Sequence, residues 1–132
     1  MRRLLVFLPA LAAPIGVAAA GEKVYRLGEL EPTEAALELT HRLTLPELAK
    51  LGFSEGRNLV LDGRVGDPAS IEGLAQELLR GHPDAIIAVG GDATRVVRQA
   101  TSTVPIVSFG ADPVRLGFAA SLAHPPAAMS PA

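Results

Sequence analysis

Two aspartates, Asp92 and Asp112, each follow a glycine at the end of a short apolar run. The first run leads into Gly90-Gly91-Asp92-Ala93-Thr94, and the second leads into Gly110-Ala111-Asp112-Pro113. An aspartate at such a place can cap a helix or pair with an amino group, and the free amides of a helix start can bind a carboxylate. The pattern is equally that of ordinary strand-to-helix turns, so both interpretations stay open here.

Other side chains give no pattern typical of catalysis. The three histidines are far apart, without the spacing of metal ligands, and no serine lies in a Gly-x-Ser-x-Gly turn. Cysteine is absent, which excludes disulfides and thiolate chemistry. We therefore predict no catalytic residue, no metal and no cofactor, and we do not expect an enzyme.

The apolar runs predict the elements that position the two aspartates. Residues 85–89 and 106–109 are typical of strands buried on both faces, and residues 24–30 and 59–65 read as two further strands. Helical patterns lie between them, at about 25 to 30 residues per repeat. This alternation predicts an α/β fold, an open parallel sheet with helices on both faces, whose loops after the strands form one ligand-binding edge.

The helix boundaries follow from capping residues. Thr33 is expected to cap a helix over 34–43 with Ala36, Leu39 and Leu43 on one face, and Pro46 predicts a fresh turn over 44–51. Asp92 is expected to cap a helix over 93–101. A helix after Asp67 and Pro68 has the clearest apolar face, listed in full as Ile71, Leu74, Ala75, Leu78 and Leu79.

The amino-terminal residues have the pattern of a secretory signal peptide. Arg2 and Arg3 precede an apolar run, and Ala18-Ala19-Ala20 is a cleavage site, so we predict a signal peptide over 1–20 and an exported, periplasmic protein. Cleavage after Ala20 removes two arginines and changes the formal charge from −2 to −4 (−2 − 2). This acidity, with one Tyr and no Trp, argues against nucleic-acid binding.

Several stretches match one family in order and spacing. They are 51–60 (Leu-Gly-Phe-Ser-Glu-Gly-Arg-Asn-Leu-Val), 74–79, 83–87, 99–107, 112–114 and 120–123. Together they resemble the substrate-binding proteins of ABC transporters, in the branch associated with tryptophan and tyrosine uptake. The resemblance covers about residues 24–123, which we take as the substrate-binding lobe within residues 21–123.

The resemblance implies a flavodoxin-like lobe of a type I periplasmic binding protein. Such a protein closes two lobes on a small, amino-acid-like solute and delivers it to an ABC permease in the membrane. By position, the resemblance implies that the ligand-binding residues lie in three loops: Glu31, Thr33, Gly90, Gly91, Asp92, Ala93, Thr94, Asp112 and Pro113. Asp92 departs from the small-residue run of the family, and its charge would oppose a carboxylate.

The tail also departs from the family, whose members continue into a second lobe. The residues after Pro126 are those that a one-base shift of codons for Gly-Gly-Asn-Val-Thr-Gly would encode. We therefore expect an irregular, frameshifted tail over 124–132 and a truncated product, which the DNA after Ala123 would test. One lobe leaves a ligand solvated, so we expect weak or no binding by the chain alone, and self-association through the exposed edge.

Two other functions stay open. Val89-Gly90-Gly91-Asp92-Ala93-Thr94 followed by Arg115-Leu116-Gly117-Phe118 is similar to elements of NAD kinases and related lipid kinases, although Ala93 stands where those enzymes have glycine. A nucleotide-binding fragment is the first alternative. The second is an inert remnant or an interaction module without a ligand.

Overall fold

A computed structural model describes residues 21–117 of the chain. In these residues strands and helices alternate, with bounds β1 (Tyr25–Glu31), α1 (Glu34–Lys50), β2 (Leu59–Val65), α2 (Ile71–Arg80), β3 (Ala85–Val89), α3 (Gly91–Ala100) and β4 (Ile106–Phe109). The predicted signal peptide over 1–20 and the predicted tail over 124–132 lie outside the described residues.

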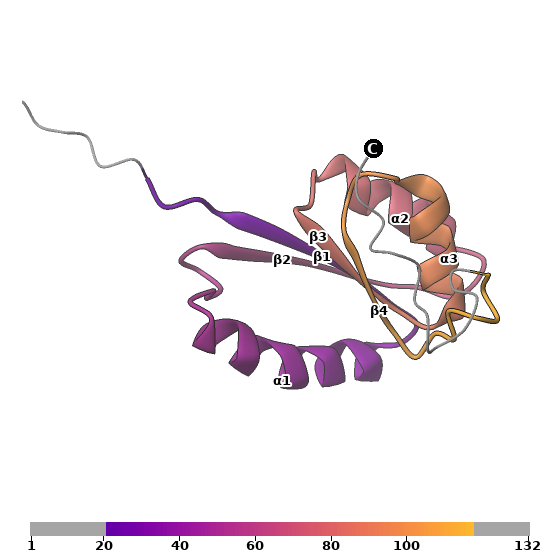
Figure 1. Cartoon of the computed structure of the whole chain (residues 1–132), viewed down its shortest axis with the longest axis horizontal. Helices are drawn as coiled ribbons and strands as arrows, with labels where there is room; N and C mark the ends of the chain where they lie inside the picture. The colour runs from indigo at the N-terminus through magenta and orange to yellow at the C-terminus, as the bar shows by residue number, and fades with distance from the viewer. Residues whose placement is uncertain (1–20, 118–132) are drawn as a thin grey trace, which may run out of the picture.

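The four strands form one sheet in the order β2-β1-β3-β4, and every neighbouring pair is parallel. Helix α1 lies on one face of this sheet, and α2 and α3 lie together on the other (Figure 1). The predicted α/β fold with an open parallel sheet is confirmed. All strands therefore end at the same edge of the sheet.

The apolar core lies between the sheet and the α2–α3 layer. Ile71, Ala75 and Leu78 of α2 pack with Leu30 of β1 and Ile86 of β3, all fully or almost fully buried. Each such leucine or isoleucine stabilises the fold by about 2 kcal/mol through removal of apolar surface from water. The predicted apolar face of α2 is confirmed.

Helix α1 differs from the prediction in continuity. It runs through Pro46 without a break, whereas a fresh turn was expected there. Proline removes a single intrahelical hydrogen bond, and side chains on both sides of it still hold the helix against the sheet region. Leu37 lies against Gly63 of β2, and Leu48 lines a pocket with Leu59. The amino-terminal cap is as predicted, since the amide of Ala36 donates to Thr33 Oγ1 at 3.1 Å.

The inward face of α1 is also different from the one expected. Leu39 and Leu43 are 46% and 59% exposed, while Thr40 is buried and His41 is half-buried. The reason lies in β1, which presents a buried glutamate, Glu29, to this helix. A polar side chain in the sheet requires polar groups opposite it, so the helix turns threonine and histidine inward.

Helix α3 begins earlier than predicted. Gly90 is its amino-terminal cap residue, with φ = 90°, and Asp92 lies in the first turn, where it caps nothing. Only glycine adopts this backbone conformation readily, so the chain turns sharply at Gly90 and the helix follows at once. The prediction that Asp92 caps α3 is therefore wrong.

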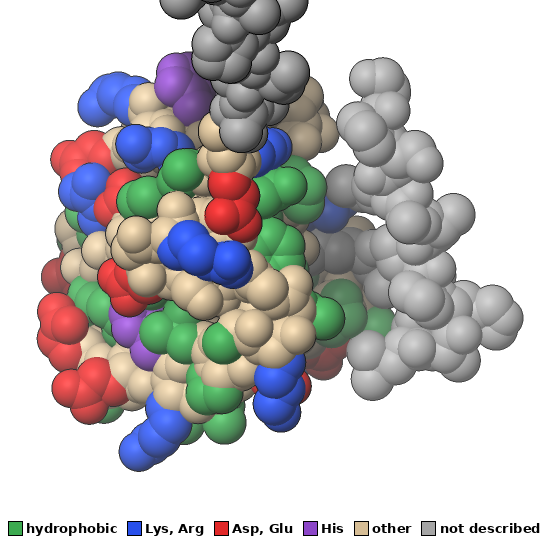
Figure 2. Space-filling view, turned by 90° about the vertical axis from the view of Figure 1, so that its left-hand side faces the viewer, with side chains coloured by type: hydrophobic (Ala, Val, Ile, Leu, Met, Phe, Trp, Pro, Cys, Tyr) green, Lys and Arg blue, Asp and Glu red, His purple; other side chains and the backbone are tan. Residues whose placement is uncertain are grey.

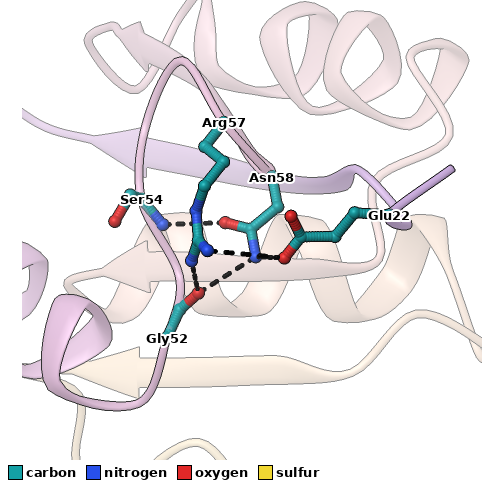
Figure 3. A network of polar contacts seen from close by, with 5 residues as sticks. All are labelled: Glu22, Gly52, Ser54, Arg57 and Asn58. Carbon is teal, nitrogen blue, oxygen red and sulfur yellow. Dashed lines mark hydrogen bonds and ion pairs between the residues drawn. The ribbon is translucent and has the colours of Figure 1, made fainter.

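The loop between α1 and β2 is tied to the start of the described chain. The Asn58 side chain donates to Gly52 O and to Glu22 Oε1 and accepts from the amide of Ser54 (Figure 3). Arg57 also donates to Gly52 O and lies 3.7 Å from Glu22 Oε1. Asn58 is buried, so its amide fixes the loop and the segment that enters β1 as one unit.

Candidate solute-binding edge

Backbone hydrogen bonds bring the predicted loops together at the carboxyl ends of the strands. The amide of Gly90 donates to Phe109 O at 2.7 Å, so the loop after β3 lies beside the loop after β4. The amide of Gly66 donates to Glu31 O at 3.1 Å, which joins the ends of β1 and β2. The strands are in register at this edge, where Glu31 pairs with Val65 and Val89 pairs with Phe109.

The loop after β3 offers unpaired amides. The first helical hydrogen bond of α3 runs from the amide of Thr94 to Gly90 O, so the amides of Gly91, Asp92 and Ala93 precede it and have no acceptor within the helix. A side chain added at Gly90 would meet nothing within 4 Å. The open space and the helix start together suit the carboxylate of a small solute.

Charge at this helix start opposes an anion. The Asp92 side chain is 61% exposed, and its Oδ1 lies 3.5 Å from Arg95 Nη2. An exposed ion pair of this length compensates little of the aspartate charge. A carboxylate ligand at the α3 amides would therefore meet a negative side chain close by.

Two predicted residues of this loop are turned into the protein. Ala93 and Thr94 are buried, and Thr94 Oγ1 lies 2.8 Å from Gly90 O and 2.5 Å from Ser108 Oγ. The hydroxyl of Thr94 thus connects the turn at Gly90 to β4. Its side chain positions the loop, and Ala93 is buried beside it in the core.

The loop after β4 repeats the turn chemistry. Asp112 Oδ1 accepts from the amides of Val114 at 2.9 Å and Arg115 at 3.2 Å, so Asp112 caps the turn that Pro113 begins, as predicted. Asp112 is exposed. Gly91 lies beside Leu116 of this turn, which places the two acidic loops next to each other.

The remaining predicted residues, Glu31 and Thr33, differ in accessibility. Thr33 is exposed at the start of α1, but the Glu31 side chain is completely buried on the α1 face of the sheet. Burial raises the pKa of Glu31, and the neighbouring Glu29 carboxyl adds to this rise, whereas Thr40 and His41 oppose it. Within the described chain neither carboxyl oxygen of Glu31 has a hydrogen-bond partner.

A buried contact beside Glu31 was not predicted from the sequence. Glu29 Oε2 lies 2.6 Å from Nε2 of His41, which comes from α1. Burial raises the pKa of Glu29, His41 lowers it, and Glu55 raises it further. Two glutamates at positions i and i+2 of a strand share a face, so their spacing was the available signal.

A separate pocket lies at the opposite end of the sheet, where β1 and β2 begin. It has a volume of about 350 Å³ and apolar walls that include Tyr25, Phe53 and Leu48. The two aromatic rings meet edge to face at 5.3 Å, and Lys23 Nζ lies 4.4 Å from the Tyr25 ring. Figure 2 views this end of the molecule, where acidic and basic side chains intermingle and no basic patch gathers.

The described residues 21–117 contain no group of three His, Asp or Glu side chains able to hold a metal ion. Nor does any helix among them have the length and apolar character to cross a membrane.

Glycine turns and a helix start at one edge of an open parallel sheet are the arrangement in which α/β proteins place their ligand-binding loops. No family model matches the chain, and no curated protein matches it. Solved structures do. A conserved domain protein from Vibrio cholerae O1 biovar El Tor matches with 28% identity and a TM-score of 0.69, over 76% of this chain and 35% of that one.

Two further structures are described as binding proteins or hold a solute. The ligand-free, open structure of CD0873, a substrate-binding protein with adhesive properties from Clostridium difficile, matches with 26% identity and a TM-score of 0.68, over 75% of this chain and 35% of that one. The ABC domain in complex with L-Trp from Streptococcus pneumoniae matches with 18% identity and a TM-score of 0.66, over 76% and 35%. The 18% match shows the fold alone.

The chain thus spans about a third of the length of each of these structures. It resembles one lobe of a substrate-binding protein, in agreement with the resemblance in the sequence. CD0873 is described as a substrate-binding protein, the Streptococcus pneumoniae domain is in complex with L-Trp, and none of the three is described as an enzyme.

Proposed function

We propose that this chain is the first lobe of an exported solute-binding protein that serves an ABC permease and receives an amino-acid-like solute at the carboxyl edge of its sheet. The observation that carries this proposal is the pairing of the Gly90 and Phe109 backbones, which sets an open helix start beside an acid-capped turn. Support comes from the similarity to CD0873, a substrate-binding protein, and from the shared fold with a domain that binds L-Trp.

The two loops suit the two ends of an amino acid. The amides of Gly91 and Asp92 would receive the carboxylate, and the exposed Asp112 carboxylate would receive the amino group. A solute at this edge is exposed to solvent on the side away from the sheet. In two-lobed binding proteins, the second lobe closes over that side of the ligand. Binding by residues 21–117 alone is therefore expected to be weak.

The proposal is tested by following backbone amide resonances of the full chain during a titration with L-tryptophan. Saturable shifts are expected at Gly91, Asp92 and Ala93, with L-tyrosine as a second ligand and ATP as the probe of the kinase alternative. Shifts confined to Tyr25 and Phe53 would place the ligand in the other pocket and contradict the proposal. ATP binding at the same amides would favour the nucleotide-binding alternative. If none of the three ligands shifts any amide resonance, an inert remnant is favoured.

A change at Asp92 tests the electrostatics of the proposed carboxylate site. Asp92→Asn is expected to tighten L-tryptophan binding about fivefold, because a unit charge about 4 Å away in an exposed site is worth about 1 kcal/mol. Glu72→Gln, an exposed change in the first turn of α2, is the control and should leave the affinity unchanged. If the same titration gives equal affinities for wild type and Asp92→Asn, the ligand carboxylate does not bind at this helix start.

Export and the permease partnership belong to the same proposal. An exported chain would begin at Gly21 after cleavage, directly before Glu22 and the contacts that Asn58 makes (Figure 3). The cleavage site would therefore lie at the edge of the folded lobe.

A further inference from the structure

Two glutamates of β1 are buried side by side in the layer between the sheet and α1. Glu29 and Glu31 alternate along the strand and so share one face of it. Both side chains are completely inaccessible to solvent. Since β1 lies between β2 and β3 in the sheet, neighbouring strands flank both carboxyls.

The surroundings supply too few donors for two negative charges. Glu29 Oε2 has one partner, His41 Nε2 at 2.6 Å. Glu29 Oε1 and both oxygens of Glu31 have no hydrogen-bond partner in the described part of the chain. A buried carboxylate is stable in its charged form only when donors or opposite charges surround it, and here one imidazole faces two carboxyl groups.

The neighbouring elements within residues 21–117 add no further cation. On the same face, β2 contributes Gly63 and Val65 opposite Glu29 and Glu31, and β3 contributes Ile87 opposite Glu29. From α1, Thr40 and His41 face the pair, and both lower the pKa of Glu31, although neither lies within hydrogen-bond distance of its oxygens. Among the described residues, Glu55 also acts on the pair and raises the pKa of Glu29.

We propose that Glu29 and Glu31 form a buried proton-binding pair, so that the lobe folds with a proton held on this pair and loses stability when the proton is released. The proton occupies a carboxyl oxygen as an O–H group, which satisfies one oxygen and removes one charge. On release, the O–H bond breaks, the proton passes to solvent near the partly exposed His41, and a second negative charge remains beneath α1.

The direction of the effect follows from the pKa shifts. Burial raises the pKa of both glutamates above 4.5 in the folded lobe. Between pH 4.5 and the folded pKa, the folded state binds more protons than the unfolded chain, so stability falls as pH rises. Asp67 and Asp84 have pKa values lowered from 3.8, by Ser70 and by the Arg26 amide respectively. Their contribution is lost as pH falls below that range, which is a separate window.

The test is urea unfolding of the full chain between pH 4.5 and 8. The wild-type unfolding constant is expected to rise by up to about tenfold per pH unit for each proton released. Glu31→Gln keeps the shape without the charge, so this variant should show a flatter profile and exceed the wild type in stability at pH 8. Glu38→Gln, on the exposed side of α1, is the control and should keep the wild-type slope.

Further variants separate the carboxyls from the imidazole. Glu29→Gln should also flatten the profile, while His41→Leu should steepen it, because leucine removes the donor that contacts Glu29. A wild-type profile that is level or rises with pH overturns the proposal, as does a Glu31→Gln profile parallel to the wild type. If Glu31→Gln does not fold, infrared absorption of the wild type at pH 6 decides. A protonated carboxyl band is expected, and its absence from the wild type overturns the proposal.

Discussion

Gly90 sets the geometry of the candidate edge at the scale of a single residue. Its positive φ ends β3 and starts α3, and its amide reaches across to Phe109 O. The same residue therefore shapes the helix start and joins the two loops. Asp92, two positions later, contributes charge and not shape.

Gly90→Ala is expected to destabilise the lobe by about 2 kcal/mol or more, since φ near 90° with an extended ψ is strained for any residue with a Cβ. Collision plays no part, because an added Cβ meets nothing within 4 Å. Gly73→Ala is the matched control: its position in α2 is equally open, and alanine there should stabilise by about 0.5–1 kcal/mol. Urea unfolding measures both, and equal effects of the two variants would contradict a special role for Gly90.

The roles of site residues were predictable only where the local backbone conformation determines them. The glycine turns and the cap by Asp112 follow from local sequence, and the structure confirms both. The inward direction of the Glu31 side chain was not predictable, because it depends on where α1 lies over β1. Asp92 was misread because an aspartate and a glycine can each occupy a cap, and only the backbone at Gly90 distinguishes them.

At the scale of the element, α1 carries the main conflict between sequence and structure. It holds a proline in its interior, exposes two leucines and turns threonine and histidine toward the sheet. The helix therefore depends on its cap at Thr33 and on contacts with β1 and β2. Helix α2, by contrast, is held by a regular apolar face.

Pro46→Ala is expected to stabilise the lobe by about 1–3 kcal/mol, because alanine restores the amide that donates within the helix and removes the clash of the ring. The measurement is urea unfolding with helix content followed by circular dichroism. Glu47→Ala, next to it and exposed, loses only the surface pair with Lys50 and should change stability by less than about 0.5 kcal/mol. Destabilisation by Pro46→Ala would show that the proline is adapted to a local bend.

The elements whose bounds were predicted most accurately are those with a regular hydrophobic pattern. The bounds of β2, β3 and β4 are those predicted, because short apolar or alternating runs between turn residues leave few alternatives. Strand β1 shifts by one residue, to Tyr25–Glu31. The buried face of α1 was predicted wrongly, because leucines of an amphipathic helix usually face the sheet. Here the sheet beneath the helix presents carboxyl groups, and the helix turns polar residues toward them.

For the whole molecule, the sheet leaves an apolar strip uncovered. Helix α1 packs on β1 and β2, and on the same face of the sheet Val107 and Phe109 of β4 are 50% and 44% exposed. Strand β4 is also the last strand of the sheet, so its outer edge has no strand partner among the described residues. An edge strand with exposed apolar side chains favours pairing with another chain.

The full chain is therefore expected to self-associate, and the double change Val107→Lys with Phe109→Lys should keep it monomeric, since lysine on an edge strand opposes pairing. Sedimentation velocity over a range of concentrations measures the difference. Val60→Lys is the control, because Val60 is exposed on β2 at the other edge of the sheet. A wild-type chain that stays monomeric, or a lysine variant that still associates, would contradict this surface as the cause.

The place of β1 in the sheet has a consequence for the order of folding. The first strand of the described residues is an inner one, and it forms its ladders with β2 and with β3, which lies more than fifty residues downstream (85 − 31 = 54 from Glu31 to Ala85). Both ladders pair β1 with strands far away in the sequence, and topologies dominated by such non-local pairings fold slowly. A nascent chain of this design therefore cannot complete the ladders of β1 until β3 has been made.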